Sequence, residues 1–210
     1  MQRFLNGRID LVKDLIKSDL SIHYADLVLI LCSVLSACAA HRWPGERIDR
    51  KRFIEMLVKY TPDLLKTSWI SVPALLNEGL ITINQTPYAN PENSTRIYCN
   101  NEIDLSFEEA VNKYPLVSCK KLRQHSYAAI IYERLRCGYA HSYWHHNSIT
   151  HVPASRRNAY FSYIGRLMDN CRERRMISIH IEYLISLTEH SVSILPEHPS
   201  EFPASWWIDG

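Results

Sequence analysis

Apolar residues recur every three or four positions along most of the chain, which is the spacing of one face of an α-helix. Breaks such as Trp43-Pro44-Gly45 mark where the expected helices end. Ser71 and Ser106 stand where capping residues open helices, and Glu109 completes a capping box with Ser106. The pattern predicts helices over residues 3–17, 24–41, 47–59, 73–78, 106–114, 118–143, 155–174 and 182–194.

Two stretches alternate apolar and polar residues instead, which is typical of β-strands. The first lies within residues 80–106, where we expect a β and loop insertion with a strand at 96–99. The second is 176–181, where isoleucine occupies every other position, and we expect it to pair with the strand at 96–99. Residues 196–210 follow neither pattern and predict an irregular tail. The fold class is therefore mainly α with a small antiparallel sheet.

Composition indicates one globular domain over residues 1–210, with 46% hydrophobic residues. The net charge of +2 is too small to indicate nucleic acid by itself. The apolar run from Leu27 to Ala40 is shorter than the roughly 18 residues that span a bilayer, so we expect a buried helix and no membrane partner. The six cysteines include no C-x-x-C pair, and the first residues lack a signal-peptide pattern. Both observations lead us to expect reduced thiols in a cytoplasmic protein.

The candidate chemistry lies at the end of the expected helix 118–143. Arg136 precedes His141 by five residues, and Tyr143 follows two residues later. Arginine is permanently charged and can direct two N–H groups at a phosphate, whereas histidine can exchange a proton near neutral pH. Together they can cleave RNA without a metal. The histidine can take the proton of the 2′-hydroxyl, and the arginine can stabilise the negative charge that develops on the phosphate. The alternative interpretation is a surface arginine beside a partly buried histidine.

Helix geometry leaves two candidates for the working arginine. In an ideal helix, residues five apart lie about 140° from one another, so Arg136 and His141 would not share a face. A bend at Gly138 would bring Arg136 inward. Otherwise Arg134, seven residues before His141, would be the partner. We favour Arg136 and keep Arg134 as a supporting residue.

The segment resembles the R-x4-6-H motif of the HEPN superfamily, and more closely its R-x4-H-x-Y form in HEPN toxins and antiviral HEPN ribonucleases. Residues 135–141, which read LRCGYAH, and the helical lead-in 127–135 carry the resemblance. It implies a HEPN-like helical bundle, here with extra N-terminal helices and the β insertion. It also implies a homodimer whose two motifs face one cleft. In toxin members the equivalent of Tyr143 is the target of a partner nucleotidyltransferase, whereas the simpler interpretation of Tyr143 is an aromatic that packs the helix end.

A cluster of histidines offers a rival chemistry. His141 and His145 are four residues apart, which is a zinc-binding spacing on a helix, and His146 and His151 follow. No H-E-x-x-H pattern accompanies them and no cysteine pair is near. We therefore expect no metal and no cofactor, with His145 and His146 solvated or in contact with phosphate.

Basic residues flank the motif on both sides and suggest an RNA footprint, although such runs are often only solvated faces. A weaker patch is Arg50-Lys51-Arg52, in which Arg52 can instead pair inside the bundle. The residues expected to bind RNA are Lys120, Lys121, Arg123, His145, His146, Arg156 and Arg157.

These observations predict a metal-independent endoribonuclease with a toxin or antiviral role, in which Arg136 and His141 are catalytic. The expected partners are RNA, a second copy of the chain, and an antitoxin or other regulatory protein. The alternative is a non-catalytic helical module that binds RNA, a nucleotide or a protein partner. The discriminating feature is whether Arg136 and His141 converge on an accessible cleft.

Overall fold

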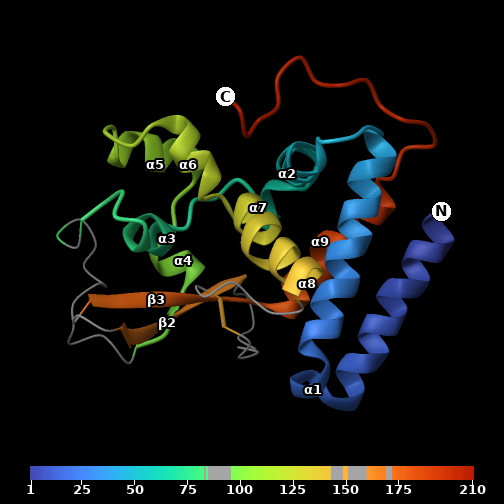
Figure 1. The fold of residues 1–210 in the computed structure, drawn as a ribbon, viewed down its shortest axis with the longest axis horizontal. Helices are drawn as coiled ribbons and strands as arrows, with labels where there is room; N and C mark the ends of the chain where they lie inside the picture. Colours follow the sequence, from blue (N-terminus) through green and yellow to red (C-terminus); the bar gives the residue numbers. More distant parts are fainter. Residues whose placement is uncertain (83, 85–95, 143–148, 151–159, 169–171) are drawn as a thin grey trace.

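The computed structural model describes residues 1–210 except 83, 85–95, 143–148, 151–159 and 169–171, which Figure 1 draws as a grey trace. The side chains of 19–23, 142, 166–168 and 172–174 also lie outside the description. The described residues are mostly helical, with one small antiparallel sheet, which confirms the mainly α class.

The N-terminal part of the protein forms α1 (Gln2–Arg42), one helix where the sequence predicted two. Figure 1 shows α1 bent sharply into two arms that lie side by side. Phe4 and Leu5 of the first arm line one groove with Leu29 and Val34 of the second, which requires the arms to be close. Residues 18–23 contain neither proline nor glycine, so the helical backbone continues through the connection.

The buried face of α1 packs against α9 (Ile181–Ser193) and α2 (Asp49–Tyr60), which the sequence predicted within two residues. The stripe expected on α2 is buried, with Phe53, Met56 and Leu57 almost inaccessible to solvent. Within α1, the segment Tyr24–Arg42 is the one described stretch long and apolar enough to cross a membrane. Half of that segment is buried inside the protein, as a core helix would be.

Short elements follow α2. A 3-10 turn, η1 (Asp63–Leu65), leads to α3 (Val72–Asn77), whose first turn is capped by the Ser71 hydroxyl. Gly79 closes α3 with a φ of +70°, a conformation that glycine adopts without strain. Further on come α4 (Asn100–Ile103) and α5 (Phe107–Lys113), and α5 begins with the predicted capping box of Ser106 and Glu109.

The sheet has the order β1-β2-β3, from β1 (Tyr98–Cys99), β2 (Phe161–Met168) and β3 (Arg172–Ile179). Two predictions were wrong here. Where the structure describes the helix expected over 155–174, the chain forms strands β2 and β3 instead, and the expected strand at 96–99 pairs with β2 instead of with β3. Phe161 and Tyr163 are both buried, with Ser162 between them. Aromatic residues at alternate positions favour a strand, and here they outweighed the helical spacing of the apolar residues.

The expected helix over 118–143 is divided. After α6 (Cys119–Gln124), the chain turns at His125, and Ser126 caps a new helix, α7 (Tyr127–Ile130). A π-helical turn, η5 (Ile131–Arg136), follows, and α8 (Cys137–Ser142) continues from it. The irregularity therefore precedes Cys137, and the bend expected at Gly138 is replaced by ordinary α-helix.

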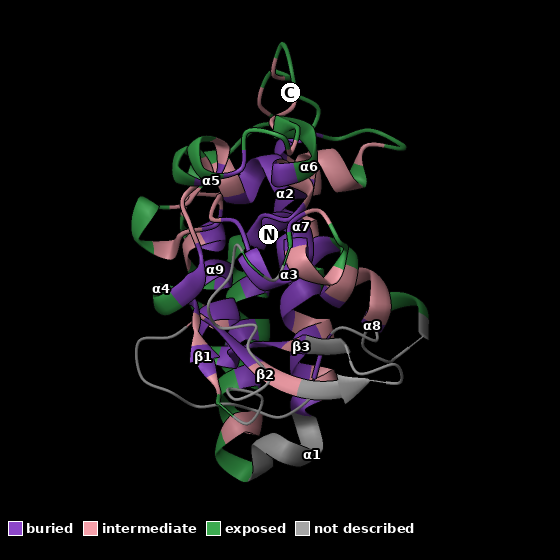
Figure 2. Ribbon diagram, turned by 90° about the vertical axis from the view of Figure 1, so that its left-hand side faces the viewer, coloured by how far each residue is buried: buried purple, intermediate pink, exposed green. Residues whose placement is uncertain are grey.

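The C-terminal segment 194–210, which contains the tail expected at 196–210, is irregular and packed against the protein. Ile208 is 1% exposed, and the backbone N–H of Trp207 donates to the Glu55 carboxylate. Trp206 stacks edge-on against Trp43 with ring centroids 5.5 Å apart. Figure 2 shows buried residues through the centre of the protein and exposed ones along this outer segment. We call residues 194–210 the C-terminal strap.

Candidate functional site

The two residues of the motif lie on successive helical turns. Arg136 ends the π-helical turn η5 and is half-buried, whereas His141 is exposed near the end of α8. The segment between them is α-helical, so the five-residue spacing leaves them on different sides of the helix. No hydrogen bond or ion pair connects these two described side chains. Within one chain, Arg136 and His141 therefore do not form a joint site.

Arg136 is half-buried and contacts its own helical neighbours. Its guanidinium carbon lies 5.3 Å from the centre of the Tyr132 ring, and a guanidinium nitrogen donates to the Cys137 sulfur at 3.9 Å. Burial raises the pKa of the Cys32 thiol on α1 to about 12, and the positive charge of Arg136 opposes that shift. Arg136 is thus oriented by Tyr132 and Cys137 of its own helical segment.

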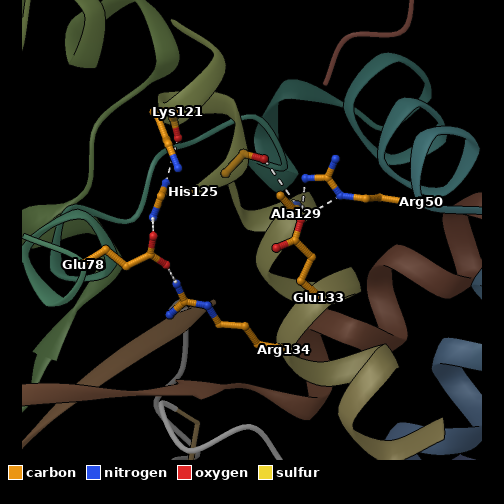
Figure 3. Close-up of polar contacts among 8 residues, drawn as sticks. Arg50, Glu78, Lys121, His125, Ala129, Glu133 and Arg134 are labelled. Atoms are coloured by element: carbon orange, nitrogen blue, oxygen red, sulfur yellow. Dashed lines mark hydrogen bonds and ion pairs between the residues drawn. The ribbon is translucent and has the colours of Figure 1, made fainter. Parts of the chain in front are cut away.

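Arg134 occupies a different environment on the same π-helical turn. Its guanidinium donates to the Glu78 carboxylate at 2.8 Å, and its side chain is only 11% exposed. Glu133, the preceding residue, receives a 2.8 Å hydrogen bond from Arg50 of α2. Figure 3 shows the two ion pairs on adjacent sides of η5. They fix the turn to α2 on one side and to the end of α3 on the other.

Sequence reasoning missed His125 and Glu78, which complete this arrangement. Nε2 of His125 lies 3.1 Å from a Glu78 carboxylate oxygen, and the histidine side chain is 2% exposed. Its other ring nitrogen, Nδ1, is 2.7 Å from the Lys121 carbonyl oxygen. Ser126 was the available signal, because a capping residue inside a helical pattern predicts a break. Nothing in the sequence indicates that residue 78 approaches residue 125.

The structure places the basic residues expected to bind RNA in different environments. Lys120 and Lys121 are exposed on α6 and are available to a ligand. Arg123 is instead packed against the strap, with its guanidinium 5.2 Å from the Phe107 ring and 5.7 Å from the Trp207 ring. The remaining candidates lie outside the described residues; they are Tyr143, His145, His146, Arg156 and Arg157.

The weaker patch Arg50-Lys51-Arg52 is used within the fold. Arg50 pairs with Glu133, and Lys51 pairs with Asp209 of the strap at 2.7 Å. Arg52 pairs with Asp49 on its own helix and donates to the Trp43 carbonyl before it, so the pairing lies on α2 itself and not inside the bundle. These three residues therefore stabilise contacts between α2 and its neighbours.

The most perturbed carboxyl group belongs to Asp104, which lies in the core away from the motif. Burial raises its pKa to about 7, against hydrogen bonds from the hydroxyls of Tyr127 and Tyr163 and from the Val72 N–H. The Tyr163 hydroxyl also lies 2.9 Å from that of Ser71. This network joins α3, α7 and β2. Its burial gives it a structural role, because no substrate can reach it.

No metal site can be assembled from the part of the chain that the structure describes, where no three His, Cys, Asp or Glu side chains gather. The zinc alternative pairs His141 with His145, which is outside that part. Comparison of the chain with protein-family models, with curated proteins and with solved structures finds no match. Among the described side chains, the candidate chemistry comprises an exposed imidazole at His141, a half-buried guanidinium at Arg136, and the carboxylate of Glu78 between two basic groups.

Proposed function

We propose that the protein is a metal-independent endoribonuclease of the HEPN type. His141 acts as general base or acid toward the 2′-hydroxyl of RNA, and Arg136 stabilises the charge that develops on the phosphate. The products are a 2′,3′-cyclic phosphate and a free 5′-hydroxyl, because the nucleophile is the RNA's own 2′-oxygen. The residue pattern and its resemblance to the HEPN motif support this proposal.

The observation that carries the proposal is the π-helical turn ending at Arg136, directly before the helix that carries exposed His141. Such turns are rare, and proteins retain them frequently at functional sites. Packing against Tyr132 holds the Arg136 side chain in place, which a preorganised electrostatic group requires. Exposure of His141 leaves its ring accessible to a ligand.

The two residues point to different sides of one helix, so the proposal includes a homodimer. A two-fold axis near His141 would let the histidine of one chain meet the arginine of its partner. It would also supply two imidazoles, one as base and one as acid, which a single chain does not offer. The toxin or antiviral role, the cytoplasmic location and a regulatory protein partner belong to the same proposal, because ribonuclease activity must be conditional in a cell.

The test uses an RNA and its all-deoxy analogue, each with and without excess chelator. We expect cleavage of RNA alone, insensitive to chelator, with cyclic phosphate ends identified by mass spectrometry. His141→Ala should lower the rate by about 10²–10⁴-fold, as removal of a proton-transfer residue does. Chelator-sensitive cleavage of both substrates would replace the HEPN mechanism with metal-activated hydrolysis.

A second candidate function is a non-catalytic module that binds RNA or another phosphate-bearing ligand. The separation of Arg136 from His141 favours it, because the two groups do not meet within one chain. The same assay decides between the candidates. RNA that is bound but not cleaved by wild-type protein, at concentrations where the dimer forms, would favour the binding module.

A further inference from the structure

The carboxylate of Glu78 lies between two buried basic side chains. One oxygen accepts from the Arg134 guanidinium at 2.8 Å, and the other lies 3.1 Å from Nε2 of His125. The side chains differ in exposure: Arg134 is 11% exposed and His125 2%, whereas Glu78 is 47% exposed. Figure 3 shows Glu78 bridging the two residues from the end of α3. Arg134 and His125 are thus largely enclosed by the protein, whereas the Glu78 carboxylate that they contact is open to solvent.

The orientation of His125 is fixed from behind. Nδ1 faces the Lys121 carbonyl oxygen at 2.7 Å, and because a carbonyl only accepts, Nδ1 carries the proton. Nε2 is therefore directed at Glu78, yet it is buried and makes no hydrogen bond of acceptable geometry. Nε2 of His125 is therefore close to the Glu78 carboxylate but forms no hydrogen bond with it. In the imidazolium form of the ring Nε2 also carries a proton and can donate to an anion. A buried N–H without a hydrogen bond is costly, so an anion oxygen placed to accept from Nε2 would bind favourably.

We propose that Arg134 and His125 form a binding site for a phosphate group, and that Glu78 occupies this site as an internal carboxylate until a phosphate displaces it. Arginine recognises carboxylate and phosphate with the same planar pair of N–H groups, so one anion can replace the other. Phosphate also offers a third oxygen toward His125. If the ligand is free phosphate, the proposal does not depend on the ribonuclease function. If the phosphate belongs to RNA, the proposal rests on that function.

Glu78 is suited to leave the site. It follows the last residue of a six-residue helix, and Gly79 after it has no neighbouring atoms within 4 Å of the position a Cβ would take. Its half-exposed carboxylate can move into water, whereas Arg134 and His125 are held by η5 and by the turn after α6. Partly exposed ion pairs are worth little in water, so a phosphate of higher charge can compete with Glu78.

The protein contains a matched control. Glu133 lies beside Arg134 in sequence and forms a comparable ion pair with Arg50, with side chains 40% and 36% exposed. It has no contact with His125 among the described residues. Glu78→Gln and Glu133→Gln therefore remove the same charge from the same side chain type, and only the first removes the competing carboxylate from the proposed site.

The experiment measures binding of inorganic phosphate by calorimetry to the wild-type chain and to both variants. We expect Glu78→Gln to bind about fivefold more tightly or better, which corresponds to release of one ion pair, while Glu133→Gln matches the wild type. Arg134→Gln added to Glu78→Gln should remove the gain. Equal affinities in all variants, or equal gains in both single variants, would overturn the proposal.

A second measurement avoids substitutions. In the wild-type chain, titration with phosphate should shift the NMR resonances of the His125 ring and leave those of His190 unchanged, because the His190 ring contacts the Tyr60 carbonyl and takes no part in the proposed site. An unshifted His125 ring at saturating phosphate contradicts the site.

A third arm replaces phosphate with a single-stranded RNA. Tighter RNA binding by Glu78→Gln, competed by phosphate, identifies RNA as the source of the phosphate. A response to inorganic phosphate without one to RNA supports the site with free phosphate as its ligand. Cleavage assays on the same variants report on the ribonuclease function separately, so failure of either proposal can be recognised.

Discussion

The hydroxyl of Tyr127 donates a 2.5 Å hydrogen bond to the carboxyl group of Asp104, and both side chains are buried. Asp104 follows α4 and precedes α5, and Tyr127 begins α7, so the bond joins the segment between α4 and α5 to the start of the motif helices. Tyr163 of β2 donates to the same carboxyl oxygen. The sheet and the motif helices are therefore fixed to one acidic group, whose protonation affects the stability of the whole fold.

The first prediction concerns the pH dependence of that stability. Burial raises the pKa of Asp104 from 3.8 to about 7, so the folded protein keeps its proton where the unfolded chain loses it. Its contribution is fully present below the unfolded pKa and is lost as pH rises to about 7. We expect the free energy of unfolding of wild type, minus that of Asp104→Asn, to fall on the order of 4 kcal/mol over this range. Denaturant unfolding at several pH values measures it, and parallel profiles for the two proteins would contradict the assignment.

The second prediction concerns the C-terminal strap. Ile208 is 1% exposed, so Ile208→Ala should lower the free energy of unfolding by about 2–5 kcal/mol through lost burial and a residual cavity. Phe202 is 55% exposed in the same segment and serves as control, with an expected change for Phe202→Ala below about 1 kcal/mol. Thermal and chemical denaturation of both variants gives the comparison. If the two substitutions cost the same, the strap is not part of the core.

The strap illustrates what the sequence could and could not predict. Its irregularity followed from the lack of a period, but its burial depends on Trp43 and Glu55, which are far away in sequence. Local signals performed well elsewhere: the capping box at Ser106 and Glu109 is present with both hydrogen bonds, 2.8 and 3.2 Å long. Such boxes involve only neighbouring residues, so no tertiary contact overrides them.

Predictions failed where tertiary pairing decided the outcome. The stretch after Ser155 contains apolar residues at spacings that suit both a helix and a strand, and the pairing of Phe161 with Ile179 selected the strand. At the candidate site, Arg136 and His141 were selected by spacing and resemblance, and the ideal-helix angle of about 140° already placed them on different sides. The sequence did not predict the π-helical turn that ends at Arg136. The association of Glu78 with His125 depends on the packing of α3 against the turn after α6, which no local pattern encodes.

The third prediction separates RNA-binding residues from structural ones on α6. Lys120 and Lys121 are exposed, so replacing both with alanine should weaken RNA binding and leave stability almost unchanged. The salt dependence of the affinity should also decrease, by about 0.7 in log–log slope for each phosphate that the variant no longer neutralises. Arg123→Ala should lower stability and leave RNA binding almost unchanged, because the Arg123 guanidinium packs on Phe107 and Trp207. Fluorescence anisotropy at several salt concentrations, together with denaturation curves, tests both expectations. A drop in RNA affinity confined to Arg123→Ala would show that the strap opens in the complex.

The last prediction compares the two arginines of the π-helical turn. Lysine keeps the charge and loses the planar fork, so both substitutions test geometry rather than charge. If Arg136 acts on the developing phosphate charge, Arg136→Lys should lower kcat by about 10²–10³-fold, as loss of a transition-state donor does. Arg134 is held by Glu78 at 2.8 Å, and in our proposal it binds a phosphate that does not react. Arg134→Lys should therefore raise KM and leave kcat nearly unchanged, because the interaction exists before and during the reaction.

Steady-state cleavage of one RNA by both variants provides these numbers, with circular dichroism as a check that each variant is folded. The reverse order, a larger loss of kcat in Arg134→Lys than in Arg136→Lys, would make Arg134 the catalytic arginine. Glu78 would then lie directly on the reacting group, and Glu78→Gln should raise kcat rather than only the affinity. The pair of measurements thus assigns each arginine to a reacting phosphate or to a bound one, since the two roles divide differently between kcat and KM.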